Sequence, residues 1–310
     1  MPARGQTRRA VLIGGSAAGV ALAATGGWAQ APAGQAVLTR AIPSSGEPLP
    51  AVGLGSWITF NVGDDARLRD ECAAVVAAFV AAGGRMIDSS PMYGSAQATI
   101  GHALRKLGDR AHVFAADKVW ISDGAKGREQ IEASRALWGI GRFDLMQVHN
   151  LLSWERHLDT LLEMKAGGQL RYVGITTSEG RRHGELERVM ASRPIDFVQV
   201  TYNALDREVE ARILPLARER GIAVIVNRPF RQKQLIRHVE RHPLPTWLAE
   251  TGAQSWAQFL LKFILANPVV TCVIPATTRV DHVRENLDAA RGMLPEAALR
   301  ERMADYVRQL

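Results

Sequence analysis

Four residues with complementary acid–base chemistry stand at or just after the ends of three apolar runs. The first run, in the sequence MIDSSPMYG, ends in Asp88 and is followed by Tyr93. The second, FAADK, ends in Lys118, and the third, LMQVH, ends in His149. Because the C-terminal ends of the strands of a parallel barrel meet at one face, these side chains are expected to converge. A carboxylate, a phenol, an ammonium and an imidazole together can transfer a proton without a metal ion.

The elements that must position these residues alternate regularly along the chain. Short apolar runs typical of strands are separated by amphipathic stretches, several of which end in Gly, as helices often do. This alternation predicts an α/β fold, and eight such runs predict a (β/α)8 TIM barrel with an extra C-terminal helix. Runs over 36–42 and 49–54 flank the turn residues 43–46 and predict an N-terminal β-hairpin. The expected barrel strands are 52–54, 86–87, 113–116, 145–148, 173–175, 197–200, 223–226 and 270–274. The clearest expected helices are 68–82, 128–138, 157–165, 185–192 and 208–220.

Length and composition fit one large folded domain and no nucleic-acid partner. The chain has 310 residues, a length that α/β barrels reach as single domains. Its formal net charge is +7, and Arg4, Arg8 and Arg9 near the N-terminus account for three charges, which leaves 7 − 3 = +4 for the remainder. No array of basic and aromatic residues accompanies this charge. Cys72 is expected on the core face of a helix and Cys272 in a buried strand, so no disulfide framework is predicted.

Residues 1–33 resemble a twin-arginine export signal. Arg8 and Arg9 precede an apolar stretch rich in Ala, Gly and Leu, and small residues follow over 29–33. The stretch is too short and too rich in Gly to predict a membrane-spanning helix, although a membrane anchor and a disordered basic tail remain alternatives. The resemblance implies the twin-arginine export machinery as a partner, a periplasmic location, and a mature barrel domain over 34–310 with no stable membrane insertion.

The residues at the strand ends, in this order, resemble the catalytic tetrad of the aldo-keto reductases, NAD(P)H-dependent carbonyl reductases built on this barrel. The resemblance implies reduction of an aldehyde or ketone to an alcohol. Tyr93 would be the acid–base residue, and Lys118 would lower the pKa of its phenol, since a nearby ammonium favours the phenolate. Asp88 would orient Lys118, and His149 would position the carbonyl of a small substrate. Each residue alone also fits a structural role, but the combination favours a site.

The resemblance covers nearly all of 34–310 and includes the positions at which the family binds its cofactor. The sequence GITT over 174–177 stands where the family usually has Gly-Val-Ser-Asn. Gln199 matches the Gln that binds the nicotinamide carboxamide, and 274–279 with 285–286 resemble the adenosine-phosphate motif. The expected cofactor-binding residues are Thr176, Thr177, Gln199, Asn227, Arg228, Pro229, Phe230, Ile274, Ala276, Thr277, Arg279, Glu285 and Asn286. Trp57 and Trp120 are expected to contact the substrate.

Several positions depart from the family pattern and bear on the choice of cofactor. Thr177 replaces the usual Asn beside the nicotinamide, and Asn227 replaces an aromatic residue that normally stacks on its ring. Ala276 replaces the usual Lys, and His282 a later Arg. Arg279 is the remaining cation suited to a 2′-phosphate. The expected cofactor is therefore NADP(H), with NAD(H) as an alternative and no metal.

Two other functions remain open at this point. An exported enzyme has no obvious supply of NADPH, so the barrel could instead keep a tightly bound NADP as a prosthetic group and shuttle hydride between two substrates. A non-catalytic barrel that senses the cofactor is a second alternative, against which the intact tetrad argues. Neither alternative follows from the fold alone.

Overall fold

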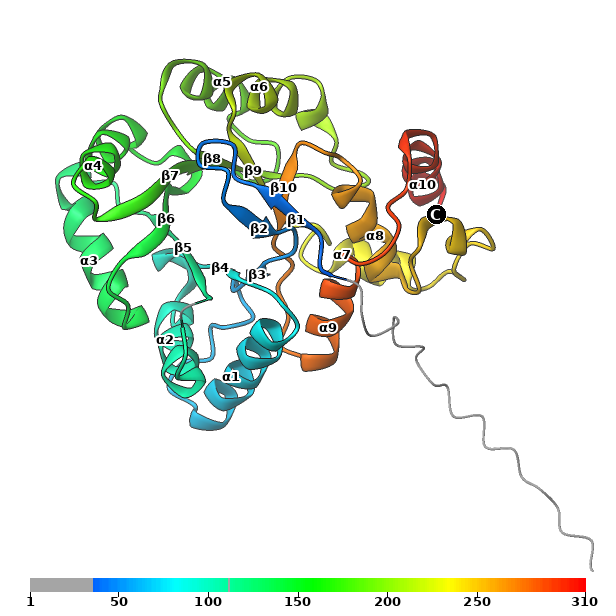
Figure 1. Ribbon diagram of the computed structural model, residues 1–310, viewed down its shortest axis with the longest axis horizontal. Helices are drawn as coiled ribbons and strands as arrows, with labels where there is room; N and C mark the ends of the chain where they lie inside the picture. Colours follow the sequence, from blue (N-terminus) through cyan, green and yellow to red (C-terminus); the bar gives the residue numbers. More distant parts are fainter. Residues whose placement is uncertain (1–35, 111) are drawn as a thin grey trace, which may run out of the picture. The chain divides into compact units, whose positions relative to one another are not determined.

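Eight parallel strands form one sheet that closes on itself (Figure 1). The computed structural model describes residues 36–110 and 112–310, so the expected export signal lies outside the described residues. Neighbours in the sheet follow the chain from β3 to β10, and backbone bonds between Gly53 N–H and Val273 O (2.8 Å) and between Val273 N–H and Ala51 O (2.9 Å) join its edges. The predicted (β/α)8 barrel is confirmed. The barrel strands are β3 (Leu54–Gly55), β4 (Met86–Asp88), β5 (Phe114–Val119), β6 (Phe143–Val148), β7 (Leu170–Thr176), β8 (Phe197–Thr201), β9 (Ala223–Asn227) and β10 (Val270–Val273).

Helices cover the outside of the barrel, and α10 is the predicted extra helix near the C-terminus (Figure 1). Most follow the apolar periodicity of the sequence closely, with buried residues on the face that packs against the strands. Within the part of the chain that is described, no helix is long and apolar enough to cross a membrane. The helices are α1 (Ala66–Ala81), α2 (Ala96–Leu107), α3 (Gly127–Trp138), α4 (Trp154–Ala166), α5 (His183–Ser192), α6 (Ile213–Arg220), α7 (Gln234–Val239), α8 (Trp256–Leu265), α9 (Val280–Asp288) and α10 (Ala297–Gln309).

One helix is shorter than its periodicity predicts. The amphipathic pattern over 208–220 predicts a single helix, but the structure has a 3₁₀ turn at Glu208–Glu210 and then α6 from Ile213. Pro215 explains the break, because it has no N–H to donate to a carbonyl one turn earlier and is tolerated only in the first turn of a helix.

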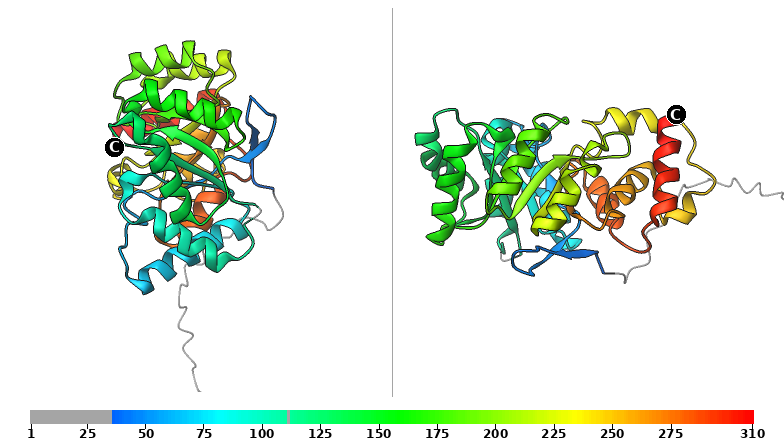
Figure 2. Two further views of the ribbon diagram at one scale, coloured as in Figure 1. Left: turned by 90° about the vertical axis from the view of Figure 1, so that its left-hand side faces the viewer. Right: turned by 90° about the horizontal axis from the view of Figure 1, so that it is seen from above.

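The N-terminal hairpin fills the bottom of the barrel. β1 (Thr39–Ala41) pairs antiparallel with β2 (Pro48–Pro50), and Figure 2 shows this hairpin across one end of the strands. Ile42 and Leu49 are fully buried in the same apolar cluster as the inward-facing strand residues, which include Phe114 and Phe197. The site therefore lies at the opposite end, where the strands terminate. Cys72 and Cys272 are both buried and free, as predicted.

Candidate active site

The structure brings the four sequence-predicted catalytic residues together at the C-terminal end of the barrel. Asp88 is the last residue of β4, Lys118 lies near the end of β5, and His149 directly follows β6. Tyr93 ends the short 3₁₀ helix Pro91–Tyr93, which Ser90 caps by accepting a bond from the Met92 N–H (3.2 Å). The rings of Tyr93 and His149 meet edge to face with centroids 5.7 Å apart. The convergence expected from the strand ends is present.

Lys118 is a fully buried ammonium held by Asp88. Its Nζ donates to Asp88 Oδ2 (2.5 Å) and to the Ser89 carbonyl (2.8 Å), and it lies 5.2 Å from the centroid of the Tyr93 ring. Burial alone would lower the pKa of Lys118, but the charge of Asp88, its hydrogen bond and the nearby Tyr93 outweigh burial, so the pKa is raised. The site therefore contains a permanent positive charge beside the Tyr93 phenol.

The pKa of Tyr93 differs in direction from the value expected from the sequence. Burial raises the pKa of Tyr93 above its usual value, Asp88 adds to this rise, and Lys118 opposes it without reversing it. The expectation that Lys118 brings the pKa below its usual value is therefore not met in this structure, because removal of the phenol from water has the larger effect. The phenol is held in its protonated form, as a proton donor requires.

His149 is neutral, and Ser90 determines which of its nitrogens carries the proton. Burial, followed by the charge of Lys118, holds the pKa of His149 well below its usual value. Ser90 Oγ lies 2.8 Å from His149 Nδ1 and already accepts from the Met92 N–H. Among the residues that the structure describes, His149 Nδ1 is the acceptor within reach of the Ser90 hydroxyl proton. Nδ1 therefore accepts, and Nε2 carries the hydrogen that can be donated to a substrate oxygen.

Ser90→Ala is expected to lower kcat/KM for the reaction of this site about tenfold, because the Nε2–H form of His149 is no longer fixed. The matched control is Ser134→Ala, which removes an equally buried hydroxyl that accepts from Gln97 (2.9 Å) between α2 and α3. Steady-state kinetics of both variants decide the point. Equal losses in the two variants would contradict the role of Ser90.

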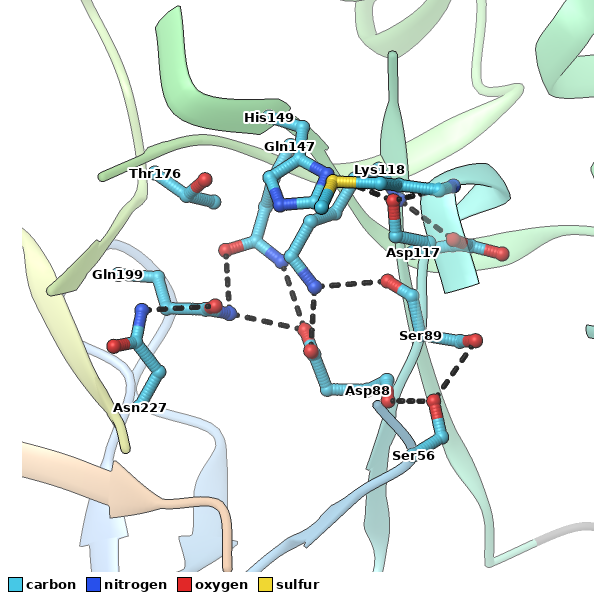
Figure 3. A network of polar contacts seen from close by, with 12 residues as sticks. Ser56, Asp88, Ser89, Asp117, Lys118, Gln147, His149, Thr176, Gln199 and Asn227 are labelled. Carbon is cyan, nitrogen blue, oxygen red and sulfur yellow. Dashed lines mark hydrogen bonds and ion pairs between the residues drawn. The ribbon is translucent and has the colours of Figure 1, made fainter. Parts of the chain in front are cut away.

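A chain of buried amides continues from Asp88 across the barrel (Figure 3). Asp88 Oδ1 accepts from Gln147 Nε2 (3.2 Å) and from Gln199 Nε2 (3.0 Å). Asn227 Nδ2 lies 3.4 Å from Gln199 Oε1 and 3.0 Å from the Thr177 carbonyl oxygen. A Cβ at Gly174 would approach Gln147 Cγ to 3.1 Å, so the missing side chain leaves space for this network. The orientation of Asp88 is thus fixed from both sides.

A cavity of about 300 Å³ opens above this network. Most of the predicted site residues contribute to its wall. Ile58, Met92 and further residues of the loop over 228–233 complete it. The predicted residues that line it are Asp88, Tyr93, His149, Trp57, Thr176, Thr177, Gln199, Asn227, Arg228, Pro229, Phe230, Ile274 and Ala276.

Six predicted residues lie elsewhere. Lys118 is beneath the cavity wall, and Trp120 is partly exposed with its ring 6.5 Å from that of His149. Arg279 is exposed and forms an ion pair with Asp281, which the sequence motif did not indicate. Of the remaining residues, Thr277 lies just before α9, close to Arg279 at the N-cap, whereas Glu285 and Asn286 lie in the second half of α9.

Two independent observations indicate that the wall of the cavity fits a dinucleotide. Thr177 Oγ1 is buried without a hydrogen-bond partner in the described part of the chain, so a bound carboxamide would satisfy it. The residues Arg231, Gln232 and Lys233 have successive φ values of 45°, 55° and 74°. The N–H groups of Gln232 and Lys233 have no partner within residues 36–110 and 112–310, and such left-handed backbone can hold an anion. Groups of His, Cys, Asp and Glu that could hold a metal are absent from the same ranges.

Sequence reasoning missed Ser90 and Gln147. Gln147 could have been found from strand alternation, because it lies in β6 two residues before His149, and residues two apart along a strand point to the same side. Ser90 had no comparable signal, because its contact with His149 joins loops 59 residues apart in the chain.

Comparisons with known proteins agree with this geometry. The sequence profile described as the aldo/keto reductase family matches residues 51–301. The methylglyoxal reductase YeaE of Escherichia coli is 28% identical over an alignment of 258 residues, with coverage of 81% of this chain and 89% of that protein. The NADH-specific methylglyoxal reductase of the same organism is 26% identical over 311 residues, with coverage of 80% and 92%.

Solved structures share the fold. The holo form of an aldo-keto reductase from Bacillus halodurans superposes with a TM-score of 0.72 at 22% identity, covering 88% of this chain and 96% of that chain. An aldo-keto reductase from Klebsiella pneumoniae, solved in complex with NADPH, superposes with a TM-score of 0.71 at 22% identity, covering 84% and 92%. Because the family profile matches most of the barrel that carries the tetrad, the chain belongs to the aldo/keto reductase family.

Proposed function

We propose that this chain catalyses the NAD(P)H-dependent reduction of an aldehyde or ketone to the corresponding alcohol. The observation that carries the proposal is the placement of Tyr93 and His149 side by side on one cavity, with the Lys118 ammonium 5.2 Å from the Tyr93 ring centroid. Family membership and the relatives named as methylglyoxal reductases support the same reaction type. They do not favour a prosthetic NADP or a non-catalytic sensing barrel.

The geometry assigns a step to each side chain. Bound NAD(P)H supplies hydride chemistry at the substrate carbonyl carbon. His149 Nε2–H donates a hydrogen bond to the carbonyl oxygen and orients it, and Tyr93 gives its phenolic proton to the same oxygen as negative charge develops there. The Lys118 ammonium stabilises the phenolate that remains, and Asp88 keeps that ammonium in place.

The direct test is consumption of NADPH or NADH by the purified protein with a simple aldehyde such as propanal. We expect catalytic turnover and one alcohol formed for each reduced cofactor consumed, measured by cofactor absorbance and product chromatography. Failure to form alcohol with either cofactor would overturn the proposed reaction. Mass spectrometry of the purified protein before cofactor is added shows whether NADP(H) co-purifies with it, and so distinguishes a tightly bound cofactor from an exchangeable one.

The choice between NADP(H) and NAD(H) is proposed to depend on Arg279. Relatives differ, since the Klebsiella protein was solved with NADPH and the Escherichia coli relative is NADH-specific. In this chain Asp281 shares the Arg279 guanidinium, so a 2′-phosphate would have to compete with that carboxylate.

Arg279→Ala is expected to weaken NADPH binding about tenfold or more, the scale of a lost charge-assisted hydrogen bond, with little change for NADH. Asp281→Asn is the matched variant, and it should strengthen NADPH binding because it frees the guanidinium. Fluorescence titration with both cofactors measures the effects. Equal losses for NADPH and NADH in Arg279→Ala would show that Arg279 does not contact the 2′-phosphate.

We also propose that residues 1–33 direct the protein through the twin-arginine route to the periplasm. The support is the Arg8-Arg9 pair ahead of a short apolar stretch of moderate hydrophobicity, and the small residues that follow it. This route carries folded proteins, which suits an enzyme that binds its cofactor in the cytoplasm.

Replacing Arg8 and Arg9 together by Lys is expected to retain the full-length precursor in the cytoplasm, because the twin-arginine route reads the guanidinium pair and not charge alone. Arg4→Lys is the matched control and should leave export intact. Cell fractionation with immunoblotting and N-terminal sequencing of the mature chain provide the measurement. Periplasmic delivery of the double Lys variant at the normal level would argue against this route.

A further inference from the structure

The cavity has two chemically different halves, which follow from the order of the strands. The loops after β3, β4 and β6 contribute Trp57, Ile58, Met92, Tyr93 and His149. The other half, where the cofactor fits, consists of Thr177 after β7, Gln199 within β8 and the loop over 228–233 after β9. The first half is therefore the space left for the substrate.

Among the described residues, no cation lines the substrate half of the cavity, because the Lys118 ammonium lies behind the wall and is paired with Asp88. Its charged side chain is Asp88, which is nearly fully buried and already bound by Lys118, and its His149 is neutral. The cations that line the cavity, Arg181, Arg228 and Lys233, come from the opposite loops. A carboxylate in the substrate half would lose its hydration without gaining a counter-charge.

Ile58 occupies a backbone conformation that β-branched residues rarely adopt. Its φ is 65°, and the Thr59 N–H donates to the Trp57 carbonyl (2.7 Å) across it, which makes a three-residue turn. Despite this strain the residue is 60% exposed, so burial of the Ile58 side chain does not account for the conformation. Strain of this kind persists where function requires it.

The turn that presents Ile58 is anchored to the next strand's loop. Asn61 Oδ1 accepts from the Ser95 N–H (3.0 Å) and hydroxyl (3.2 Å) at the start of α2. Gly94 permits this contact, because a Cβ there would lie 2.3 Å from Asn61 Oδ1. Ile58 is thus held at the rim of the cavity by a fixed support.

Exposed apolar side chains gather at the same rim. Six large hydrophobic residues are substantially exposed in the described ranges. Two of them, Ile58 and Met92, line the cavity on the loops after β3 and β4, and a third, Trp120, lies just outside its wall directly after β5, with its ring 6.5 Å from that of His149. Trp57 lies behind them with its ring 6.3 Å from that of Tyr93. Exposed apolar area beside a reacting centre favours a ligand that covers it.

We propose that this site selects neutral carbonyl compounds that carry an apolar substituent of about phenyl size, and that Ile58 is a specificity-determining contact for that substituent. The proposal rests on the proposed carbonyl reduction and narrows its substrate class. A small ketoaldehyde would leave Ile58, Met92 and Trp120 exposed to water, whereas an aryl group extending from the reacting carbon covers them.

The experiment compares propanal with 3-phenylpropanal, which have the same reacting group, using the full-length protein and NADPH. We expect kcat/KM to favour 3-phenylpropanal at least about 100-fold, by the usual discrimination of apolar pockets summed over a ring. Ile58→Asn keeps a residue that tolerates positive φ and removes the apolar contact, so it should lower this ratio about tenfold. Leu137→Gln, at a residue 46% exposed on α3 and outside the cavity wall, is the matched control and should leave the ratio unchanged.

A second pair of aldehydes tests whether the substrate half disfavours a negatively charged substituent. We expect 4-methylbenzaldehyde to be reduced with a kcat/KM at least about tenfold above that of 4-carboxybenzaldehyde, because the carboxylate meets no cation. Equal kcat/KM for propanal and 3-phenylpropanal, or for the two benzaldehydes, would overturn the selectivity and leave carbonyl reduction standing. An unchanged ratio in Ile58→Asn would remove Ile58 from the proposal. Absence of turnover with all four aldehydes would overturn the proposed function itself.

Discussion

Tyr93→Phe is expected to lower kcat for aldehyde reduction about 100-fold or more, with little change in cofactor affinity. The variant removes one oxygen from a ring that contacts Trp57 and His149 and keeps the ring in place. The loss is the usual scale for removing a positioned proton donor. Steady-state kinetics with NADPH and a reactive aldehyde, together with cofactor titration, measure both quantities.

Tyr172→Phe is the matched control for this experiment. Tyr172 lies at the bottom of the barrel, where its hydroxyl bonds to Ser45 Oγ (2.7 Å) and Glu47 Oε2 (2.8 Å), far from the cavity wall. Its loss should reduce stability and leave kcat near the wild-type value. Ordinary turnover by Tyr93→Phe would refute the assignment of the proton donor.

The pH dependence of the wild type follows from the same two groups. Burial holds the pKa of His149 well below 6.5, so His149 stays neutral and no change in rate is expected near that pH. Burial raises the pKa of Tyr93 above 10.0, so the donor stays protonated through neutral pH. Above pH 6.5, the rate of reduction should therefore fall only as the pH rises through this raised pKa of Tyr93. A bell-shaped profile centred near pH 6–7 would contradict both protonation states.

Lys118→Met is expected to lower kcat to a similar extent and, in addition, to destabilise the protein by about 3–5 kcal/mol. The variant leaves the Asp88 carboxylate buried without its counter-ion, and the amides of Gln147 and Gln199 supply hydrogen bonds but no charge. Thermal unfolding and kinetics on the same samples separate the two effects. The double variant Asp88→Leu with Lys118→Met should regain part of the stability and none of the activity, because it removes the unpaired charge.

Lys262→Met provides the control. Lys262 is also fully buried, but its ammonium donates to the carbonyls of Arg291 (2.9 Å) and Met293 (2.6 Å) and has no carboxylate partner within the described residues. Burial lowers the pKa of Lys262 to about 8. Its replacement should cost stability and leave kcat unaffected. If Lys118→Met lost stability but retained kcat, Lys118 would be structural only.

The sequence by itself determined the barrel and the position of the tetrad. Strand periodicity and the alternation of strands with helices are local properties of the sequence. The geometry of a parallel barrel then brings the C-terminal ends of all its strands to one face. Asp88, Lys118 and His149 could therefore be placed together before any contact was known. The lengths of individual helices were predicted less accurately from the sequence. The helix expected over 208–220, for example, is interrupted ahead of Pro215 and begins as α6 only at Ile213.

Only the tertiary structure decided how these residues behave. The direction of the Tyr93 pKa depends on how much water the surrounding loops exclude, which no local pattern records. The hydrogen bond between Ser90 and His149 and the ion pair between Arg279 and Asp281 both depend on loop conformations. The exposed Ile58 depends on a positive φ that its sequence disfavours. Local pattern specifies which end of each strand faces the site, whereas burial, partners and strain arise from contacts between segments that are distant in the chain.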